Sequence, residues 1–384
     1  MKRNFLIVGS GLSGAIAANF LANQMDSKVL IIDKRSHIGG NCYTEKDPST
    51  KITIHKYGPH IFNSPNSRVI NFWKKFVELK PYTHSVKAII PKQGVYQLPI
   101  NLHTINQFFH QTFSPSEAKA FLAERAMPIP NPANFEEQAL SMLGVELYEA
   151  FFKGYTQKQW GVEPKQLPAS ILKRIPVRFN YSDSYYHSSY SAIPVNGYTE
   201  LFENLLKHKN ITLKLGVEYS PSMNNSFTHV FYSGGIDSYF SYKYGPLGYR
   251  SVFWEDHITE GDFQGASQIN YPTMTLPYTR IIEHKYFMPW TSISKSIYSY
   301  EYSKETTLTD EPYYPKRLDS DLLTLRQYHS LAHNEENVTF MGRLGTYRYL
   351  DMWKVTLETL ELMDLAHLAY SSGSPFPLFS FDPL

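Results

Sequence analysis

The sequence has almost no cysteine, no long apolar run and no excess of one charge. Its single cysteine, Cys42, excludes an internal disulfide framework and is typical of a reducing compartment, so we expect a cytoplasmic protein. Apolar runs such as 5–8 are too short to span a membrane, and the glycines that follow do not fit a secretory signal. Lys plus Arg number 37 against 35 Asp plus Glu, and no adjacent basic pair extends to a third residue. Neither a nucleic-acid partner nor membrane insertion is therefore expected.

Common patterns of protein-based catalysis are missing as well. The chain has no G-x-S-x-G elbow, no Ser-His-Asp pattern and no Cys/His cluster with metal-ligand spacing. No metal site is therefore predicted.

The chain is long and rich in aromatic residues. Its 384 residues correspond to two or three domains at about 150 residues each. A chain of this size buries roughly three quarters of the surface that its unfolded form exposes. It contains 29 Tyr and 24 Phe. Because Tyr combines an apolar ring with a polar tip, this composition suits a site that holds rings and sugars.

A glycine-rich turn near the N-terminus predicts a dinucleotide site. A short apolar strand pattern over 5–8 leads into the G-x-G-x-x-G spacing of Gly9, Gly11 and Gly14, and small helix-forming residues follow. The glycines allow a tight turn and close approach to a pyrophosphate, while the helix N-terminus supplies N–H donors. The next strand pattern ends in Asp33, where this fingerprint places a carboxylate for a ribose hydroxyl.

A second glycine pair distinguishes between the possible dinucleotides. Gly39 and Gly40 follow shortly after Asp33 and allow the backbone to approach a ligand closely. A nicotinamide dehydrogenase has no need of this pair, whereas flavoproteins that resemble glutathione reductase commonly have it. The cofactor is therefore predicted to be FAD.

The rest of the chain shows two other kinds of secondary-structure pattern. Ser114 and Glu117 form a capping box pattern, and helical patterns follow it. Short stretches rich in Tyr, Thr and Ile between Pro and Gly predict an antiparallel sheet. Asp351 is the expected N-cap of a last helix that is buried on several sides. We therefore predict an α/β protein with a discontinuous Rossmann-like FAD-binding domain over 1–80, 195–245 and 320–384, an inserted helical domain over 101–178, and an antiparallel β-sheet domain over 81–100, 179–194 and 246–319.

Several longer sequence motifs lie between residue 5 and about 356, and together they are specific enough to indicate a family. They are D-K-R-S-H-I-G-G-N (33–41), Y-G-P-H-I-F (57–62), L-P-I-N-L (98–102), F-K-G-Y-T (152–156), K-Q-W-G (158–161), R-I-P-V-R (174–178), P-Y-T-R (277–280), E-P-Y-Y-P (311–315) and G-R-L (342–344). Together they resemble the bacterial UDP-galactopyranose mutase family, and the resemblance covers nearly the whole chain.

This resemblance implies an isomerase that interconverts UDP-galactopyranose and UDP-galactofuranose without net redox change. In this family FAD must be reduced, and its N5 acts as the nucleophile at the anomeric carbon while UDP leaves. Cofactor chemistry of this kind explains why no protein nucleophile was found. The resemblance also implies UDP-galactose as substrate, an external reductant such as NAD(P)H, a homodimer, and a product used for cell-surface polysaccharide biosynthesis.

The matching positions receive expected roles from the same resemblance. Arg174, between Pro168 and Pro176, and Arg280 are expected to hold the leaving diphosphate, because a guanidinium fork fits phosphate oxygens. Trp160 is expected to act as a lid over the sugar rather than as a core residue. The other expected substrate-binding residues are His84, Phe151, Phe152, Tyr155, Thr156, Tyr185, Asn270, Tyr314 and Tyr349.

Flavin contacts and two departures complete the expected site. His60 is counted as catalytic with the two arginines, because its turn is expected to lie against the flavin. Asn63 replaces the second His of the family's usual H-I-F-H-T, and His84 stands where Asn is common. These departures bear on local affinity and pH dependence rather than on the reaction class. The other expected flavin contacts are Gly9, Gly11, Ser13, Gly14, Asp33, Lys34, Gly40, Asn41, Ile61, Arg343, Asp351 and Met352.

Three alternative functions stay open at this point. One is a mutase that acts on UDP-N-acetylgalactopyranose, which the volume near the sugar 2-position would decide. Another is an amine-oxidase-like FAD oxidoreductase, which leaves the pair Arg174 and Arg280 unexplained. The last is a flavin-binding subunit without chemistry, which a shallow uridine cleft would favour.

Overall fold

A five-stranded parallel sheet forms the centre of the first unit of the computed structural model, which describes residues 4–173 and 177–384. The strand order is β10-β2-β1-β11-β17, and every pairing is parallel. Because helices cover both faces, the strands at the centre of the sheet are buried almost throughout, whereas the edge strand over 211–215 is largely exposed. The strands are β1 (Asn4–Val8), β2 (Lys28–Asp33), β10 (Ile211–Leu215), β11 (His229–Tyr232) and β17 (Val338–Phe340).

Two hydrophobic cores cover the faces of this parallel sheet. One face packs against α1 (Leu12–Gln24), α2 (Ser67–Trp73), α8 (Thr199–Leu206) and α12 (Met352–Ser372). The other face packs against α9 (Ile236–Tyr239) and α10 (Asp319–Ala332). The short α11 (Gly342–Gly345) follows β17, and η4 (Pro221–Ser226) precedes β11. Asp351 occupies the N-cap position of α12, and Leu360 is buried as well as the face of Val355 and Leu362. Leu365 and Leu368 are exposed, so one side of the helix faces solvent, and Leu365 is not buried as expected.

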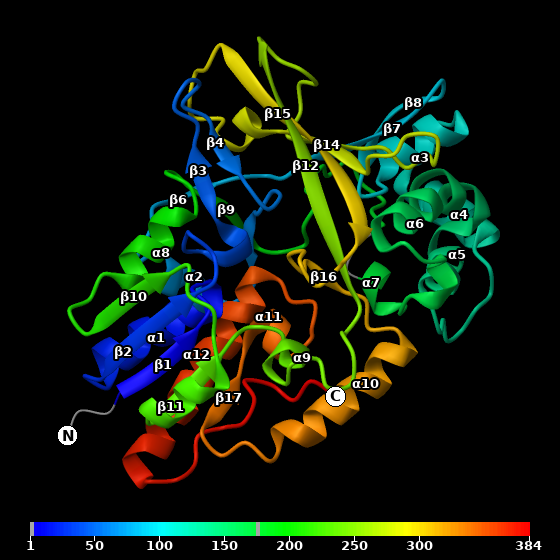
Figure 1. Cartoon of the computed structure of the whole chain (residues 1–384). Coiled ribbons are helices and arrows are strands. Elements are labelled where there is room, and N and C mark those ends of the chain that lie inside the picture. The colour runs from blue at the N-terminus through cyan, green and yellow to red at the C-terminus, as the bar shows by residue number, and fades with distance from the viewer. Residues whose placement is uncertain (1–3, 174–176) are drawn as a thin grey trace.

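A seven-stranded sheet forms the second unit and extends across the top of the molecule (Figure 1). Its order is β16-β12-β15-β14-β13-β7-β8, and all pairs are antiparallel except β13 with β7. The long β12–β15 ribbon brings Arg280 of β14 and Tyr314 of β16 to one sheet. The elements are β7 (Val86–Ile90), β8 (Gly94–Leu98), β12 (Tyr249–Glu260), β13 (Gln268–Asn270), β14 (Arg280–Glu283), η5 (His284–Phe287), β15 (Lys295–Glu305) and β16 (Tyr314–Pro315).

Two small sheets and a short helix join the larger units. Strands β5 (Phe62–Ser64), β9 (Tyr190–Pro194) and β6 (Leu79–Pro81) form one small sheet in the order β5-β9-β6. The predicted segment 179–194 therefore contributes its strand to this sheet and not to the seven-stranded one. Strands β3 (Thr44–Lys46) and β4 (Thr53–His55) pair with each other, and η1 (Gly40–Cys42) precedes them.

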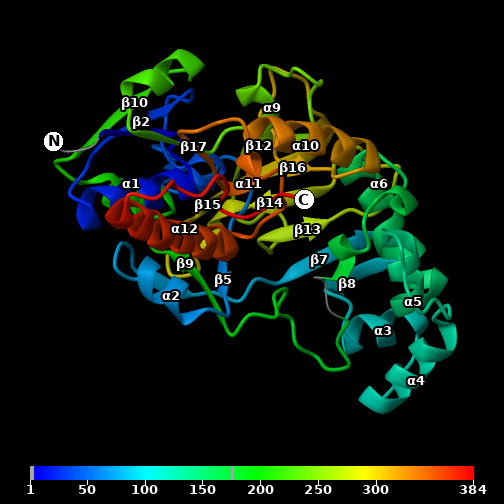
Figure 2. The same ribbon diagram turned by 90° about the horizontal axis from the view of Figure 1, so that it is seen from below.

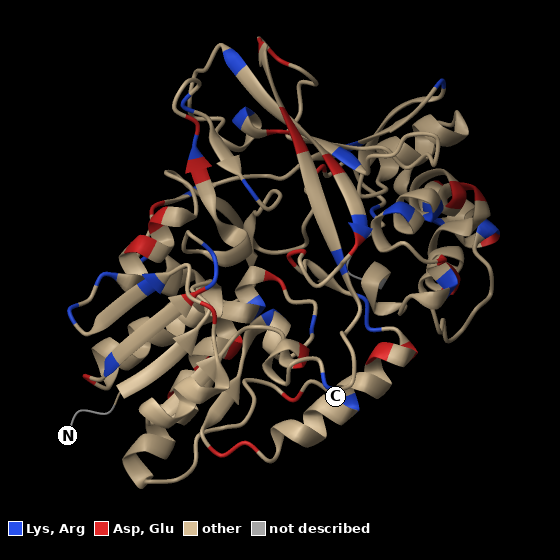
Figure 3. Ribbon diagram, in the orientation of Figure 1, with Lys and Arg blue, Asp and Glu red and all other residues tan. Residues whose placement is uncertain are grey.

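The helical unit lies at the side of the seven-stranded sheet, away from α1 and α12 (Figure 2). The capping box that begins α4 is present, with the Ser114 N–H donating to Glu117 Oε2 at 2.8 Å. Among the described residues, no helix is long and apolar enough to cross a membrane. Lys and Arg are interspersed with Asp and Glu along the elements in view (Figure 3). The elements are α3 (Leu102–Phe109), α4 (Pro115–Arg125), α5 (Phe135–Leu147), the π-helix η2 (Tyr148–Lys153), α6 (Gly154–Trp160), η3 (Pro164–Gln166) and α7 (Ser170–Lys173).

Candidate active site

A cavity of about 1350 Å³ lies where the three units meet. Sites for one small molecule have volumes of about 300–1,000 Å³, so this cavity has room for a cofactor and a substrate together. Of the predicted site residues that the structure describes, Gly14 and His84 do not line it. Those that do are Gly9, Gly11, Ser13, Asp33, Lys34, Gly40, Asn41, His60, Ile61, Phe151, Phe152, Tyr155, Thr156, Trp160, Tyr185, Asn270, Arg280, Tyr314, Arg343, Tyr349, Asp351 and Met352.

The glycine-rich turn forms the wall at one end. Gly9 has a φ of 98°, which side chains disfavour. Gly11 and Ser13 lie at the N-terminus of α1, where the first N–H groups have no partner within the helix. Gly14 lies behind the turn, and a Cβ there would stand 1.8 Å from the carbonyl oxygen of Gly9. Gly14 is therefore needed for helix packing, not for direct ligand contact.

The second glycine pair packs against the first. Gly39 and Gly40 have φ values of 93° and 54°. A Cβ on Gly40 would lie 3.1 Å from the Cα of Gly11. The two glycine signatures, far apart in sequence, thus close around the same space.

Asp33 lies at the carboxyl end of β2 and is held by several donors. Its Oδ2 accepts from the N–H and the hydroxyl of Ser10, both at 2.7 Å, and its Oδ1 accepts from the Arg35 N–H at 2.9 Å. Since a carboxylate has about four acceptor positions, one remains for a ligand hydroxyl. Lys34 and Arg35 also pair with Glu311, at 3.1 Å and 2.5 Å, which ties this end of the cavity to the loop before β16.

His60 lies on the turn between β4 and β5, next to the middle of the cavity. Its backbone N–H donates to His55 Nδ1 at 3.2 Å, and its own Nδ1 lies 2.8 Å from the carbonyl oxygen of Gly58. That contact assigns the ring proton to Nδ1. Burial lowers the pKa of His60 to about 4, so the ring is neutral near pH 7 and does not act there as a cationic acid.

The N-terminus of α12 also faces the cavity. Asp351 and Met352 line the wall where this 21-residue helix begins. Nearby, Arg343 Nη2 donates to the Tyr313 carbonyl at 2.5 Å, and its guanidinium lies 5.2 Å from the centre of the Tyr349 ring. Two helix N-termini and one arginine provide hydrogen-bond donors at this end that suit a phosphate group.

A buried ion pair dominates the opposite end of the cavity. Arg280 donates from Nε and Nη2 to Glu301 Oε2, at 2.8 Å and 2.6 Å, across the β14–β15 pairing. Glu301 is fully buried and accepts a further bond from the Thr279 hydroxyl at 2.9 Å. Arg280 Nη1 has a weak contact with Gln268 Oε1 at 3.4 Å, which leaves donors for an anion in the cavity.

Tyrosines surround this arginine. Tyr314 of β16 stacks on Tyr349, with ring centres 5.7 Å apart. Burial raises the pKa of Tyr155 and of Tyr314, so both hydroxyls stay protonated and can donate to phosphate oxygens. Tyr185 lines the same wall.

The π-helix η2 and α6 supply the remaining aromatic wall. Phe152 borders the cavity, while Phe151 also packs on Tyr96 in the helical core, with ring centres 5.2 Å apart. Trp160 is only 8% exposed and belongs to the core cluster of α5, η2 and α7. The expectation that Trp160 is not a core residue was therefore wrong, because the indole packs in this cluster and also lines the cavity.

Asn270 and His84 differ in their access to the cavity. Asn270 lines it and accepts from Gln268 Nε2 at 2.9 Å. His84 lies behind the wall, with its ring 5.7 Å from Tyr185 and 5.9 Å from Tyr186. Burial lowers its pKa to about 3, so it supports the tyrosines as a neutral ring.

Comparisons with known proteins agree with this geometry. A family model described as UDP-galactopyranose mutase matches residues 150–349. A Klebsiella pneumoniae protein named as a probable UDP-galactopyranose mutase is 49% identical over 99% of this chain and 98% of its own length.

The chain belongs to the UDP-galactopyranose mutase family.

It is therefore an enzyme of the mutase class. Within the same range of similarity, a dTDP-fucopyranose mutase of Escherichia coli is 46% identical over 94% of this chain and 97% of its own length. A crystal structure of reduced UDP-galactopyranose mutase aligns with a TM-score of 0.76 over 99% of both chains, at 14% identity, which shows a shared fold.

Two family models match residues at different ends of the cavity of this mutase-family enzyme. A model described as an NAD(P)-binding Rossmann-like domain matches residues 7–76, which include both glycine signatures, Asp33 and His60. The mutase model covers the end with Arg280 and the tyrosines. Arg174 falls within that match but lies outside the described residues. Among the residues that the structure does describe, no cluster of His, Cys, Asp or Glu could hold a metal ion.

Sequence reasoning missed several residues of the mutase-family site. Glu301 was not singled out, although Ser299, Glu301 and Ser303 alternate with three tyrosines and so face the other side of β15. Gln159 was also missed, and its buried Oε1 has no hydrogen-bond partner among the described residues. The helical periodicity of α6 does not single out Gln159, because several adjacent residues of this helix also line the cavity.

Proposed function

We propose that this enzyme interconverts UDP-galactopyranose and UDP-galactofuranose with reduced FAD as its cofactor. The observation that carries the proposal is one cavity that joins a dinucleotide cradle to a buried Arg280–Glu301 pair lined by tyrosines. The first end suits FAD, and the second suits the diphosphate of a sugar nucleotide. The relatives named for this activity support the same substrate.

The cradle residues fit FAD. Gly9, Gly11 and Gly40 line the cavity without side chains, so they would let the pyrophosphate approach the backbone at the α1 N-terminus. The remaining acceptor position of Asp33 would take a ribose hydroxyl, and the backbone at Met352 would hold the other half of the cofactor. When bound and reduced, FAD supplies a nucleophilic ring nitrogen for the anomeric carbon.

The protein side of the reaction is positioning and charge compensation. Glu301 fixes the plane of the Arg280 guanidinium, so its remaining donors stay aimed at the departing diphosphate and need no rearrangement as charge develops. Tyr155 and Tyr314 donate hydrogen bonds from their hydroxyls to the same phosphates. Trp160 and its neighbours exclude water from the sugar. Arg174 is proposed as the second diphosphate ligand.

A second candidate substrate is dTDP-fucopyranose, because a relative named for it is nearly as similar to this chain. That nucleotide differs by a thymine methyl group, a missing ribose 2′-hydroxyl and a missing sugar 6-hydroxyl. The same diphosphate leaves the same anomeric carbon, so Arg280 and the tyrosines serve both substrates. The choice therefore depends on contacts to the base, ribose and C6, and it must be measured.

Turnover of the two furanose nucleotides tests the proposal and separates the candidates. FAD-loaded protein is incubated with UDP-galactofuranose or dTDP-fucofuranose, with and without dithionite, and the pyranose product is followed by chromatography. We expect UDP-galactopyranose to form at the higher kcat/KM, only after reduction, and without stoichiometric use of reductant. Equal turnover by oxidised enzyme would exclude the reduced flavin as the nucleophile, whereas net consumption of an oxidant would favour an amine-oxidase-like reaction. UDP-N-acetylgalactofuranose in a third arm tests the N-acetyl alternative.

We also propose a cytoplasmic homodimer that receives electrons from NAD(P)H and supplies galactofuranose for surface polysaccharide. A reducing compartment would keep the flavin reduced and suits the single buried Cys42. Support for a dimer comes from the outer face of the β12–β15 ribbon, where Phe253 and Phe263 are exposed and stack on Tyr302 and Tyr298. Light scattering of the purified protein and of Phe253→Glu tests the dimer.

A further inference from the structure

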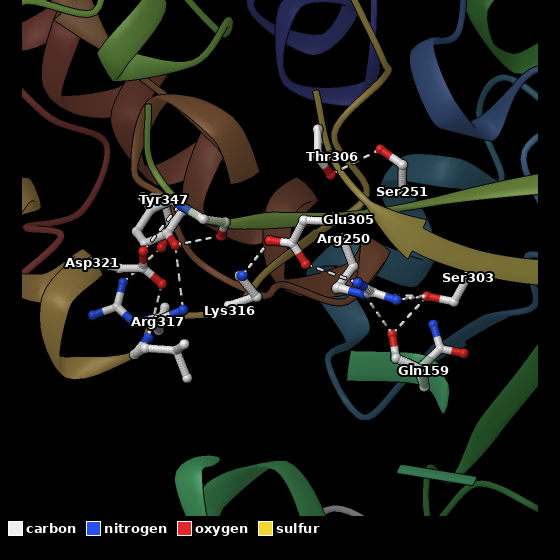
Figure 4. Close-up of polar contacts among 12 residues, drawn as sticks. Gln159, Arg250, Ser251, Ser303, Glu305, Thr306, Lys316, Arg317, Asp321 and Tyr347 are labelled. Carbon is white, nitrogen blue, oxygen red and sulfur yellow. Dashed lines mark hydrogen bonds and ion pairs between the residues drawn. The ribbon is translucent and has the colours of Figure 1, made fainter. Parts of the chain in front are cut away.

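The last turn of α6 is held by an arginine from the neighbouring sheet (Figure 4). The Arg250 side chain, on β12, is 6% exposed. Its Nε donates to the Gln159 carbonyl at 3.1 Å, and its Nη2 lies 3.4 Å from the Lys158 carbonyl. Carbonyls in the last turn of a helix have no N–H partner within it, and a cation there is favoured by the helix dipole. Arg250 therefore caps the helix that ends in Trp160.

The same guanidinium is fixed on its other side by β15 (Figure 4). Arg250 Nη1 donates to Glu305 Oε2 at 2.8 Å, and Nη2 donates to the Ser303 hydroxyl at 3.1 Å. Ser303 in turn donates to the Gln159 carbonyl at 2.7 Å, and Glu305 also pairs with Lys316. Because α6 and β15 contact the guanidinium on opposite sides, the Arg250 side chain is held in one orientation.

Arg250 is also linked through its backbone to Tyr314, which packs against Trp160. It pairs with Tyr314 across β12 and β16, and its carbonyl accepts from the Tyr313 N–H at 2.9 Å. The Tyr314 ring lies 6.1 Å from the ring of Trp160. One residue thus connects two aromatic rings that pack against each other in the wall at this end of the cavity.

The attachment of α6 to the sheet is tight elsewhere too. Gly161, with a φ of 69°, ends the helix, and a Cβ there would stand 2.5 Å from Arg250 Nη1. Lys158 Nζ donates to the carbonyls of Tyr271, Leu276 and Tyr278 at 2.6, 3.1 and 2.8 Å. The position of α6 is therefore set by the sheet as well as by the helices that precede it.

We propose that Arg250 is a positioning residue for the reaction, because it sets the distance between Trp160 and Tyr314. Arg250 itself does not line the cavity, so it acts through these two rings and not by ligand contact. A displacement of about 1 Å in a catalytic wall can cost roughly 100-fold in rate. The inference rests on the proposed mutase activity for its kinetic readout only.

Kinetics of three variants test the proposal. Arg250→Met removes the cap, Arg250→Lys keeps a cation at the helix end, and Arg317→Met is the control. Arg317 donates to the carbonyls of Tyr347 and Pro383 and does not contact α6. We expect Arg250→Met to lower kcat by roughly 10- to 100-fold with UDP affinity within about threefold. Arg250→Lys should recover part of kcat, and Arg317→Met should stay within about twofold.

A double-mutant cycle shows whether Arg250 acts through Trp160. If it does, adding Arg250→Met to Trp160→Phe should lower kcat by less than about threefold, since coupled sites are not additive. A substrate-free readout is the ¹⁹F spectrum of protein labelled with 5-fluorotryptophan, in which Trp160→Phe identifies the Trp160 signal. Arg250→Met and Arg250→Lys should shift that signal, and Arg317→Met should not.

The outcomes separate this inference from the proposed function. An unmoved Trp160 signal in both Arg250 variants, or full additivity in the cycle, overturns the positioning role. A kcat loss matched by an equal loss of UDP affinity also overturns it. If wild-type protein does not turn over UDP-galactofuranose, the proposed function fails while the ¹⁹F comparison still decides the role of Arg250. If Arg250→Met does not fold, Arg250→Lys carries the same comparison.

Discussion

Truncation of Trp160 should damage both stability and catalysis, because the indole is at once core and cavity wall. It packs with Phe135, Tyr148, Leu167 and Leu172 in one cluster. Full truncation of a buried aromatic side chain costs about 3–5 kcal/mol of unfolding free energy. Since one edge of the ring borders the cavity, water can enter the space left behind, and we expect the lower end, about 3 kcal/mol.

The assay compares Trp160→Ala with Trp160→Phe. Thermal unfolding by circular dichroism should show a drop of roughly 6–12 °C for the alanine variant, at about 2–4 °C per kcal/mol for a large domain. The phenylalanine variant keeps a ring in the cluster and should lose less than half of that. Turnover of the sugar nucleotide should fall in both variants, and more in alanine.

Two results would refute this reasoning. An unchanged melting temperature for Trp160→Ala would show that the indole is not packed and would restore the lid interpretation. A large drop in melting temperature with normal turnover of the surviving folded protein would show that Trp160 has no part in the site. Measuring UDP affinity on the same samples separates loss of fold from loss of binding.

Other positions give predictions of different kinds. Gly14→Ala should purify without yellow flavin, because its Cβ would stand 1.8 Å from the Gly9 carbonyl; flavin absorbance equal to wild type would contradict this. Arg280→Lys keeps the charge but loses the fork, so calorimetry should show UDP binding weakened by about 10- to 100-fold with the melting temperature nearly unchanged; wild-type affinity would remove Arg280 from the diphosphate site. Burial holds the pKa of His84 near 3, so below pH 6.5 the unfolded chain takes up a proton that the folded chain does not, and stability falls. Denaturant unfolding should therefore show His84→Asn losing roughly 2 kcal/mol less than wild type between pH 7 and pH 5, and equal losses in the two proteins would contradict this.

Local patterns predicted the dinucleotide end of the cavity well. The strand, glycine turn and helix around Gly11 are adjacent in sequence, and the acid at the end of the next strand sits where β2 ends. Such features depend on backbone conformation and on residues close in the chain, so spacing reveals them. The capping box at Ser114 could be predicted for the same reason, since its two residues are three positions apart.

The substrate end depended more on resemblance than on pattern. Tyr314 and Tyr349 are two among 29 tyrosines, and no periodicity separates those in the cavity from those in the core. The expectation that Trp160 is not a core residue was wrong because the residues that bury it come from α5, η2 and α7, and local sequence does not show how these elements pack.

The sequence by itself determined the parallel-sheet cofactor unit, the helical insertion and the family, because each is written in local spacing or in strings of adjacent residues. Only the tertiary structure decided that Glu301 meets Arg280, that Gly40 packs on Gly11 and that His84 lies behind the wall. Strand alternation tells which face a side chain occupies, but it does not tell which strand lies alongside or in which register. The order and register of the strands are set by how the whole chain buries its apolar surface, and the chemistry of this cavity depends on both.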